Sequence, residues 1–235
     1  FSEVSNEYKR PIGNPNYNCG MFDIGFRVID MQKTYNEMSQ TYEFFNKPKS
    51  YTAPWTSNAV QEVILWSPDR VPTAFMMSGN YEGDRFLNIT TNAYFTKDID
   101  KANIFFTKVL GMDIVFDKIM PLGLVNDILG IPDSDEPRIT MAFKKGINSP
   151  VPEMILCQHE DAKNVNDISE PTAIGLMAAS YEVDNIYNAV LNAKELGYKL
   201  INESYVYDNG IDGQVKSTII IGPDNALYEV YQVIA

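Results

Sequence analysis

The chain has 235 residues and a formal net charge of −12, from 31 acidic and 19 basic side chains. Its 45% hydrophobic fraction is typical of a globular protein with a sizeable core, and its apolar runs fall far short of the roughly 20 residues that cross a bilayer. Because Lys144-Lys145 is the largest basic cluster, the charge argues against nucleic acid and against an anionic membrane surface as partners.

The cysteines favour a reducing compartment. Cys19 and Cys157 lie far apart, and neither belongs to a CxxC or Cys/His pattern, so neither zinc nor a disulfide framework is indicated. We interpret Cys157 as a small buried hydrophobe within an apolar strand. No secretory signal is visible, and we therefore expect a cytoplasmic protein.

The first complete module is predicted at residues 21–79. Strands are expected at Phe22–Ile29, Ala59–Trp66 and Thr73–Met77. Apolar residues at helical spacing, beginning at Met31, predict a helix after the first strand. A polar linker then leads into the next module.

The second module, residues 87–160, contains the clearest unit of the chain. Within Asp98–Asp117, an acidic start and an apolar stripe at i, i+3, i+4 and i+7 predict a helix. A glycine at 111 is expected to end that helix, and a strand is expected to follow. Two further strands are expected at Arg138–Lys145 and Pro152–His159. The long loop Pro121–Pro137 could form one or two turns of helix, and loops of this length are more often functional or lids than idle.

The same order of elements recurs in residues 172–235, with a strand at Ile174–Val183, a helix at Asn185–Leu196 and three closing strands. The segment 1–20 matches the connection 156–175 in length and character. We therefore expect it to be the tail of a further module whose remainder is missing from this chain.

Two segments resemble the vicinal oxygen chelate superfamily of glyoxalase I, bleomycin-resistance proteins and extradiol dioxygenases: TTNAYFTKDIDKANIFFTKVLGMDIVFD and GPDNALYEVYQ. The resemblance implies an α+β, glyoxalase-like fold of repeated βαβββ modules, paired to form a curved, partly closed mixed sheet around a cleft. In this scheme residues 1–86 hold the remnant, one module and the linker. Modules 87–160 and 172–235 are expected to pair with each other.

In metal-dependent members of the superfamily, each module supplies one ligand from its first strand and one from its last, usually His and Glu. The resemblance places these positions at Thr91, Gln158, Met177 or Ala178, and Glu229, with Glu3, Asp23 and Met76 in the other module pair. Only Glu229 matches in the first set, whereas Glu3 and Asp23 could hold a hard cation weakly. Because zinc, nickel and iron favour imidazole ligands, we expect no catalytic transition metal and no cofactor, and extradiol chemistry is disfavoured.

Glu229 is the candidate catalytic residue. It lies in an apolar strand, where an unpaired carboxylate would have a raised pKa that suits a general base or a substrate anchor. A neighbouring Lys, Tyr or backbone group could instead hold it. The expected ligand-binding residues are Thr91, Gln158, Met177, Tyr181 and Tyr231. If Gln158 faces the cleft, His159 faces away, and we interpret this single histidine as a solvated strand-end residue.

These observations favour an enzyme that acts on a small organic molecule in an apolar cleft. Lyase or isomerase chemistry on a substrate with a carbonyl or hydroxyl group would suit a lone carboxylate. The alternative is a non-catalytic protein of the bleomycin-resistance type that sequesters a hydrophobic compound. The oligomeric state does not follow from the sequence, and a homodimer is one option.

Overall fold

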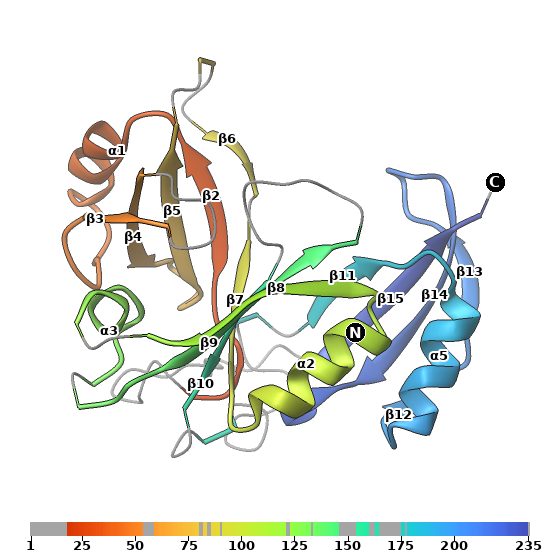
Figure 1. Ribbon diagram of the computed structural model, residues 1–235. Coiled ribbons are helices and arrows are strands. Elements are labelled where there is room, and N and C mark those ends of the chain that lie inside the picture. Colours follow the sequence, from red (N-terminus) through yellow and green to blue (C-terminus); the bar gives the residue numbers. More distant parts are fainter. Residues whose placement is uncertain are drawn as a thin grey trace.

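The structure is a computed structural model, and it describes residues 18–53, 59–79, 82–83, 86–89, 91–120, 123–132, 134–145, 154–159, 163–164, 175–176 and 178–234. Within these ranges it contains four α-helices, one short 3-10 helix and fifteen strands in three mixed sheets (Figure 1). The fold class is therefore α+β, as expected. No helix in this part of the chain is long and apolar enough to span a membrane.

The first sheet has the strand order β3-β4-β5-β2-β6. Its strands are β2 (Ile24–Val28), β3 (Lys49–Thr52), β4 (Ala59–Trp66), β5 (Pro72–Ser78) and β6 (Phe86–Ile89). The helix α1 (Met31–Met38) ends before the apolar spacing does, because the chain turns after Met38 and joins the edge of the sheet. There the amide of Phe45 donates to the carbonyl oxygen of Ile64 at 2.8 Å.

The second sheet has the order β1-β7-β10-β9-β8. Its strands are β1 (Gly20–Met21), β7 (Asn92–Thr96), β8 (Met112–Ile119), β9 (Arg138–Lys144) and β10 (Met154–Gln158). The helix α2 (Ile99–Lys108) begins at Asp98, whose Oδ1 accepts from the amide of Lys101 at 2.9 Å. Gly111 follows it with a φ of +71°, a conformation that favours glycine. The predicted helix is confirmed.

The third sheet has the order β11-β15-β14-β12, with β13 also on β14. Its elements are β11 (Ala178–Glu182), α5 (Ile186–Glu195), β12 (Lys199–Leu200), β13 (Tyr205–Asp208), β14 (Gln214–Ile221) and β15 (Leu227–Val233), the last two separated by the short helix η1 (Pro223–Asn225). In all three sheets the first strand of the repeat runs parallel to the last, and the last runs antiparallel to the third. The repeated βαβββ order is confirmed.

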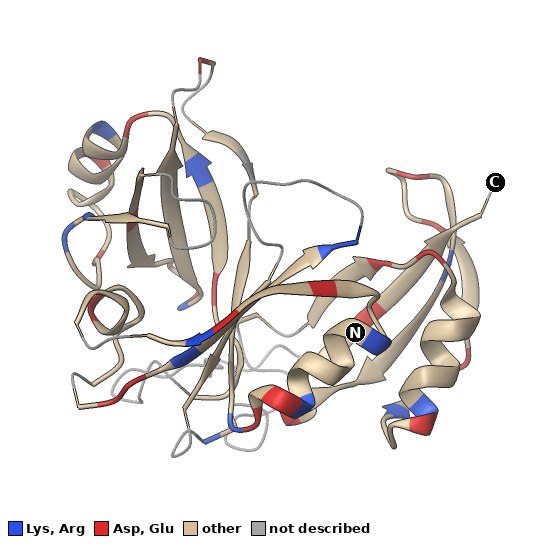
Figure 2. Ribbon diagram, viewed as in Figure 1, with Lys and Arg blue, Asp and Glu red and all other residues tan. Residues whose placement is uncertain are grey.

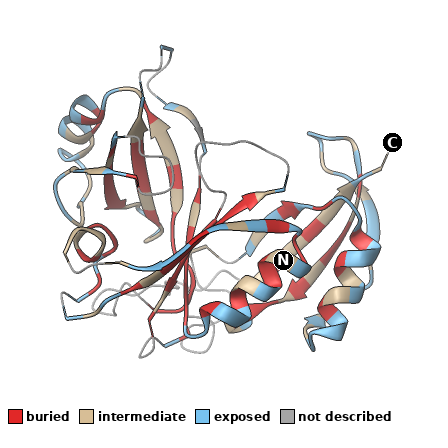
Figure 3. Cartoon of the chain, viewed as in Figure 1, coloured by how far each residue is buried: buried red, intermediate tan, exposed pale blue. Residues whose placement is uncertain are grey.

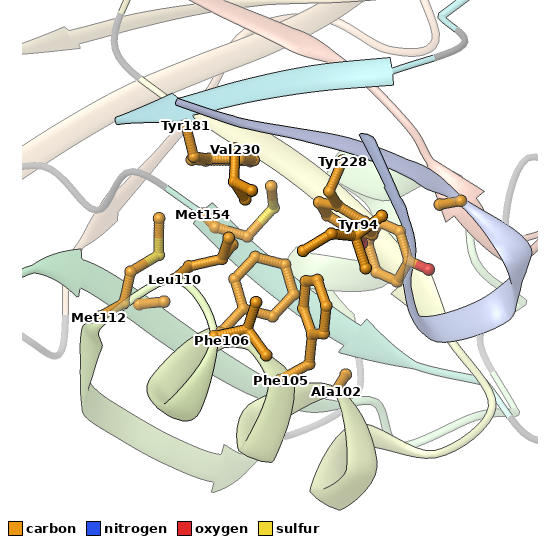
Figure 4. Packing of buried hydrophobic residues seen from close by; sticks show 14 of the residues in the cluster. Tyr94, Ala102, Phe105, Phe106, Leu110, Met112, Met154, Tyr181, Tyr228 and Val230 are labelled. Atoms are coloured by element: carbon orange, nitrogen blue, oxygen red, sulfur yellow. The ribbon is translucent and has the colours of Figure 1, made fainter. Parts of the chain in front are cut away.

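The second and third sheets share one core through their helices. α2 packs on β8, β9 and β10, α5 packs on β14 and β15, and the two helices touch. Phe105 is fully buried, with its ring centroid 4.7 Å from that of Tyr228 and 5.0 Å from that of Tyr198. Figure 4 shows Phe105 and Phe106 of α2 directed toward Tyr228, and Figure 3 shows buried positions along one side of α2.

The first and second sheets are joined edge to edge. Residues 20–28 run antiparallel to residues 86–89 and 91–96, with Gly20 opposite Phe95 and Phe26 opposite Ile89. Between these pairs the amide of Phe22 donates to Ala93 O at 2.9 Å, and that of Gly25 donates to Thr91 O at 2.7 Å.

This junction corrects the expected pairing of modules. We expected the sheets of 87–160 and 172–235 to enclose the cleft together. The outer edge of β7 instead bonds to residues 20–25, so the sheet of 87–160 is continuous with that of 21–79. Its contact with the third sheet runs mainly through α2 and α5, and Tyr94 of β7 also donates to Pro223 O at 2.6 Å.

Replacing Phe105 with Ala should lower the free energy of unfolding by about 3–5 kcal/mol, because the cavity would open between two sheets that share this side chain. Ile104 is its neighbour in α2 and is 47% exposed, so Ile104→Ala should cost less than about 1 kcal/mol. Urea denaturation of both variants measures the difference. Equal losses would contradict the orientation of α2.

Candidate functional site

A cavity of about 350 Å³ lies between the first and second sheets, beneath the short helix α3 (Leu124–Leu129). Strands β3 and β4 line one side, and β8, β9 and β10 line the other. Most of the lining is apolar and includes Phe116, Met120, Ile128, Ile139, Met141 and Ile155. A volume of this size accommodates one small organic molecule.

The cover of the cavity comes from the long loop in which we predicted a short helix, and that helix is confirmed as α3. Asn126 is fully buried and ties the loop together: its Nδ2 donates to Pro132 O and Asp135 O, both at 2.7 Å. An ion pair of 2.5 Å between Lys49 and Asp127 links α3 to β3 of the first sheet.

The polar centre of the cavity is a pair formed by Tyr51 and Glu62. The Tyr51 hydroxyl donates to Oε2 of Glu62 at 2.7 Å, and Glu62 is 8% exposed. Burial raises the pKa of Glu62, and the hydrogen bond from Tyr51 opposes this only in part. Burial and the nearby Glu62 charge raise the pKa of Tyr51 well above its usual value, so its hydroxyl stays protonated.

A buried carboxyl group with a raised pKa in an apolar cavity is suited to general acid–base catalysis. Sequence reasoning missed Glu62 because the resemblance directs attention to the first and last strands of each module, whereas β4 is the third. A signal was present, since Glu62 stands in the apolar strand AVQEVILW just as Glu229 stands in LYEVYQV.

Most of the predicted ligand-binding residues lie elsewhere. Ile155 of β10 faces the cavity, and side chains alternate along a strand, so Gln158 of the same strand faces the other side. There it accepts from the amide of Ile99, at the start of α2, at 3.4 Å. Thr91 is buried at the junction of the two sheets. Tyr181 belongs to the core beside α2. Met177 lies outside the described residues.

The interpretation of His159 as a solvated residue is wrong. Its side chain is 8% exposed, and its Nε2 lies 2.6 Å from Oδ2 of Asp135. Hydrogen bonds from Ser134 and from His159 lower the pKa of Asp135. Because Gln158 turns toward α2, His159 turns the other way and meets the loop that carries α3.

Glu229 and Tyr231 lie on the third sheet, away from the cavity. Three hydroxyls donate to the Glu229 carboxylate: Ser180 at 2.5 Å, Ser217 at 2.7 Å and Tyr207 at 2.8 Å. Burial raises the pKa of Glu229, but these hydrogen bonds outweigh it and leave the pKa below its usual value. Glu229 is therefore a stabilised carboxylate that neighbouring groups hold, which was the alternative interpretation of this residue.

The described residues do not fit the divalent ion of the metal-dependent superfamily members. Among the residues that the structure describes, no three His, Cys, Asp or Glu side chains come close enough to hold a metal. Asp23 is 2% exposed and accepts from the amide of Ala93 at 2.6 Å. Gln158 is engaged with α2, and Glu3 lies outside the described ranges.

No model of a known protein family matches the sequence, and no curated protein matches it. The structure resembles that of glyoxalase I from Zea mays, at 14% identity and a TM-score of 0.61 over 92% of this chain and 68% of that one. A variant of that enzyme gives 15% identity and a TM-score of 0.62 over the same shares. A putative dioxygenase from Bacillus subtilis gives 7% identity and a TM-score of 0.53 over 94% of this chain and 64% of that chain.

These likenesses establish the fold. The chain has the glyoxalase-like fold that the sequence motifs indicated. Because the sequence identities are low, these likenesses do not identify the reaction, which depends on the residues of this chain.

Glu62 should titrate above its usual pKa of 4.5, and Tyr51→Phe should raise that pKa further because the hydroxyl stabilises the charged form. NMR of carboxyl-labelled glutamate measures both shifts. In the folded state Glu62 binds its proton more tightly than in the unfolded state, so stability relative to Glu62→Gln should fall as the pH rises from 4.5 through the folded-state pKa. A pKa at or below 4.5 would contradict the assignment.

Proposed function

We propose that the protein binds a small, largely apolar organic molecule beneath α3 and transfers a proton on it, in lyase or isomerase chemistry. The observation that carries the proposal is the pair formed by Tyr51 and the buried Glu62 in a largely apolar cavity. A hydroxyl group on the ligand can donate to the Glu62 carboxylate and a carbonyl oxygen can accept from Lys118, while the apolar part of the ligand fills the remaining volume.

The proposed step starts with an ionised Glu62. Its carboxylate takes a proton from the carbon next to a carbonyl group, the C–H electrons form the enolate, and negative charge develops on the carbonyl oxygen. Lys118 is the cationic side chain of the lining and stabilises that charge. Return of the proton to another atom completes an isomerisation, whereas departure of a group from the neighbouring carbon completes an elimination.

Non-catalytic sequestration is the second candidate. The apolar lining favours it, because affinity for a hydrophobic compound needs little more than a dry pocket of the right size. The hydrogen bonds of Asn126 and the Lys49–Asp127 ion pair hold α3 over the cavity. A fixed cover of this kind also suits a protein that retains its ligand.

Acetophenone is a suitable probe because its methyl hydrogens are acidic and its ring is apolar. In deuterated water the wild type should accelerate exchange of these hydrogens by about 100-fold or more over buffer, and Glu62→Gln should abolish the acceleration. NMR follows the exchange. The Gln side chain is neutral and has nearly the shape of Glu, and Lys118 can still donate to the carbonyl oxygen, so the affinity of this variant for acetophenone should stay within a few fold of the wild type.

The isostere α-methylstyrene, in which a methylene group replaces the carbonyl oxygen, tests the polar contact separately. The wild type should bind acetophenone about tenfold more tightly because Lys118 donates to its carbonyl oxygen, and Lys118→Met should remove this preference. Tight binding of acetophenone without any exchange in the wild type would overturn the catalytic proposal and support sequestration. Failure to bind either compound would overturn both.

A further inference from the structure

The third sheet presents a second polar site on the face opposite α5. Tyr228 and Val230 point into the core that α2 and α5 share, so Glu229 and Tyr231 lie on the other face. Ser180 stands directly opposite Glu229 in β11, and Ser217 stands opposite Tyr231 in β14. The register of the strands therefore assembles this site, which is independent of the cavity beneath α3.

The carboxylate at the centre of this site is held in a fixed orientation. Oε1 of Glu229 accepts from Ser217 and Tyr207, and Oε2 accepts from Ser180. Because a carboxylate offers about four lone-pair positions, one position on Oε2 stays available to a further donor. The half-buried carboxylate is thus a preorganised negative charge that can still be reached from solvent.

Tyrosine residues lie on the same face of the sheet as this charge. The rings of Tyr205 and Tyr207 stack with centroids 5.4 Å apart and an interplanar angle of 24°, and Tyr205 is 44% exposed. Tyr205 and Tyr231 stand on either side of Ser217 in one row across the sheet. Glu182 continues the row beside Tyr231 and pairs with Lys144 at 2.8 Å.

We propose that this patch, defined by Ser180, Tyr205, Tyr207, Ser217, Glu229 and Tyr231, binds an organic ammonium ion. The cationic group lies against Glu229, and its alkyl substituents pack on the tyrosine rings, whose faces attract cations. An inorganic divalent ion is disfavoured because it needs several charged or imidazole ligands, and no three His, Cys, Asp or Glu side chains of the described residues come close enough to hold one.

The charge of the whole chain supports a cationic ligand. The net charge of −12 raises the local concentration of cations over the surface. Figure 2 shows Lys and Arg scattered over several elements rather than gathered in one. Around Tyr231, the nearby carboxylates are Glu182, Glu229 and Asp212, and Lys144 is the one cation that contributes there among the described residues.

Choline and its neutral isostere, in which a tert-butyl group replaces the trimethylammonium group, test the proposal by calorimetric titration. The wild type should bind choline about tenfold or more tightly than the isostere. Glu229→Gln should remove this preference, and Tyr205→Ala, at an exposed position, should weaken choline binding several fold. Glu195→Gln removes an exposed charge from α5 and should leave the affinity unchanged.

Thermal unfolding of each variant shows whether it is folded before titration. Equal affinities of the wild type for choline and for the isostere would overturn the proposal. A folded Glu229→Gln variant with the choline affinity of the wild type would also overturn it, as would a loss in Glu195→Gln equal to that in Glu229→Gln.

Discussion

The antiparallel junction of residues 20–28 with residues 86–89 and 91–96 is the constraint on which the candidate site depends. It makes one continuous surface from two sheets and so brings β3 and β4 opposite β8 and β9. Its central bonds join Phe22 and Gly25 to residues 93 and 91, and Asp23 accepts from the amide of Ala93. Because Asp23 is buried, loss of its carboxylate would leave that amide unsatisfied, which costs more than a single surface hydrogen bond.

The pKa values of two glutamates on sheet faces, Glu62 and Glu229, are shifted in opposite directions. Glu62 has one hydroxyl donor inside an apolar cavity, so burial dominates and its pKa rises. Glu229 has three hydroxyl donors on a more open face, and its pKa falls. The same residue type in the same kind of apolar strand is therefore suited to proton transfer in one place and to holding a cation in the other.

Local features of the sequence predicted the repeated elements well. The Asp98 cap, the apolar stripe of α2 and the glycine at 111 are interactions within a few residues, and they appear as expected. The pairing of modules could not be predicted in this way, because it depends on which strand edge meets which across long separations. The burial of His159 was missed for a related reason: the loop that covers it bonds through Asn126 to groups several residues away.

Methionine methyl groups offer the most direct test of the central claim that a ligand binds between the first two sheets. Met120 and Met141 line the cavity, whereas Met31 begins α1 and packs in the core of the first sheet, and Met112 packs in the core around α2. Titration of methyl-labelled protein with acetophenone should shift the resonances of Met120 and Met141 and leave those of Met31 and Met112 in place. Saturable shifts at Met31 or Met112, with Met120 and Met141 unaffected, would contradict the account.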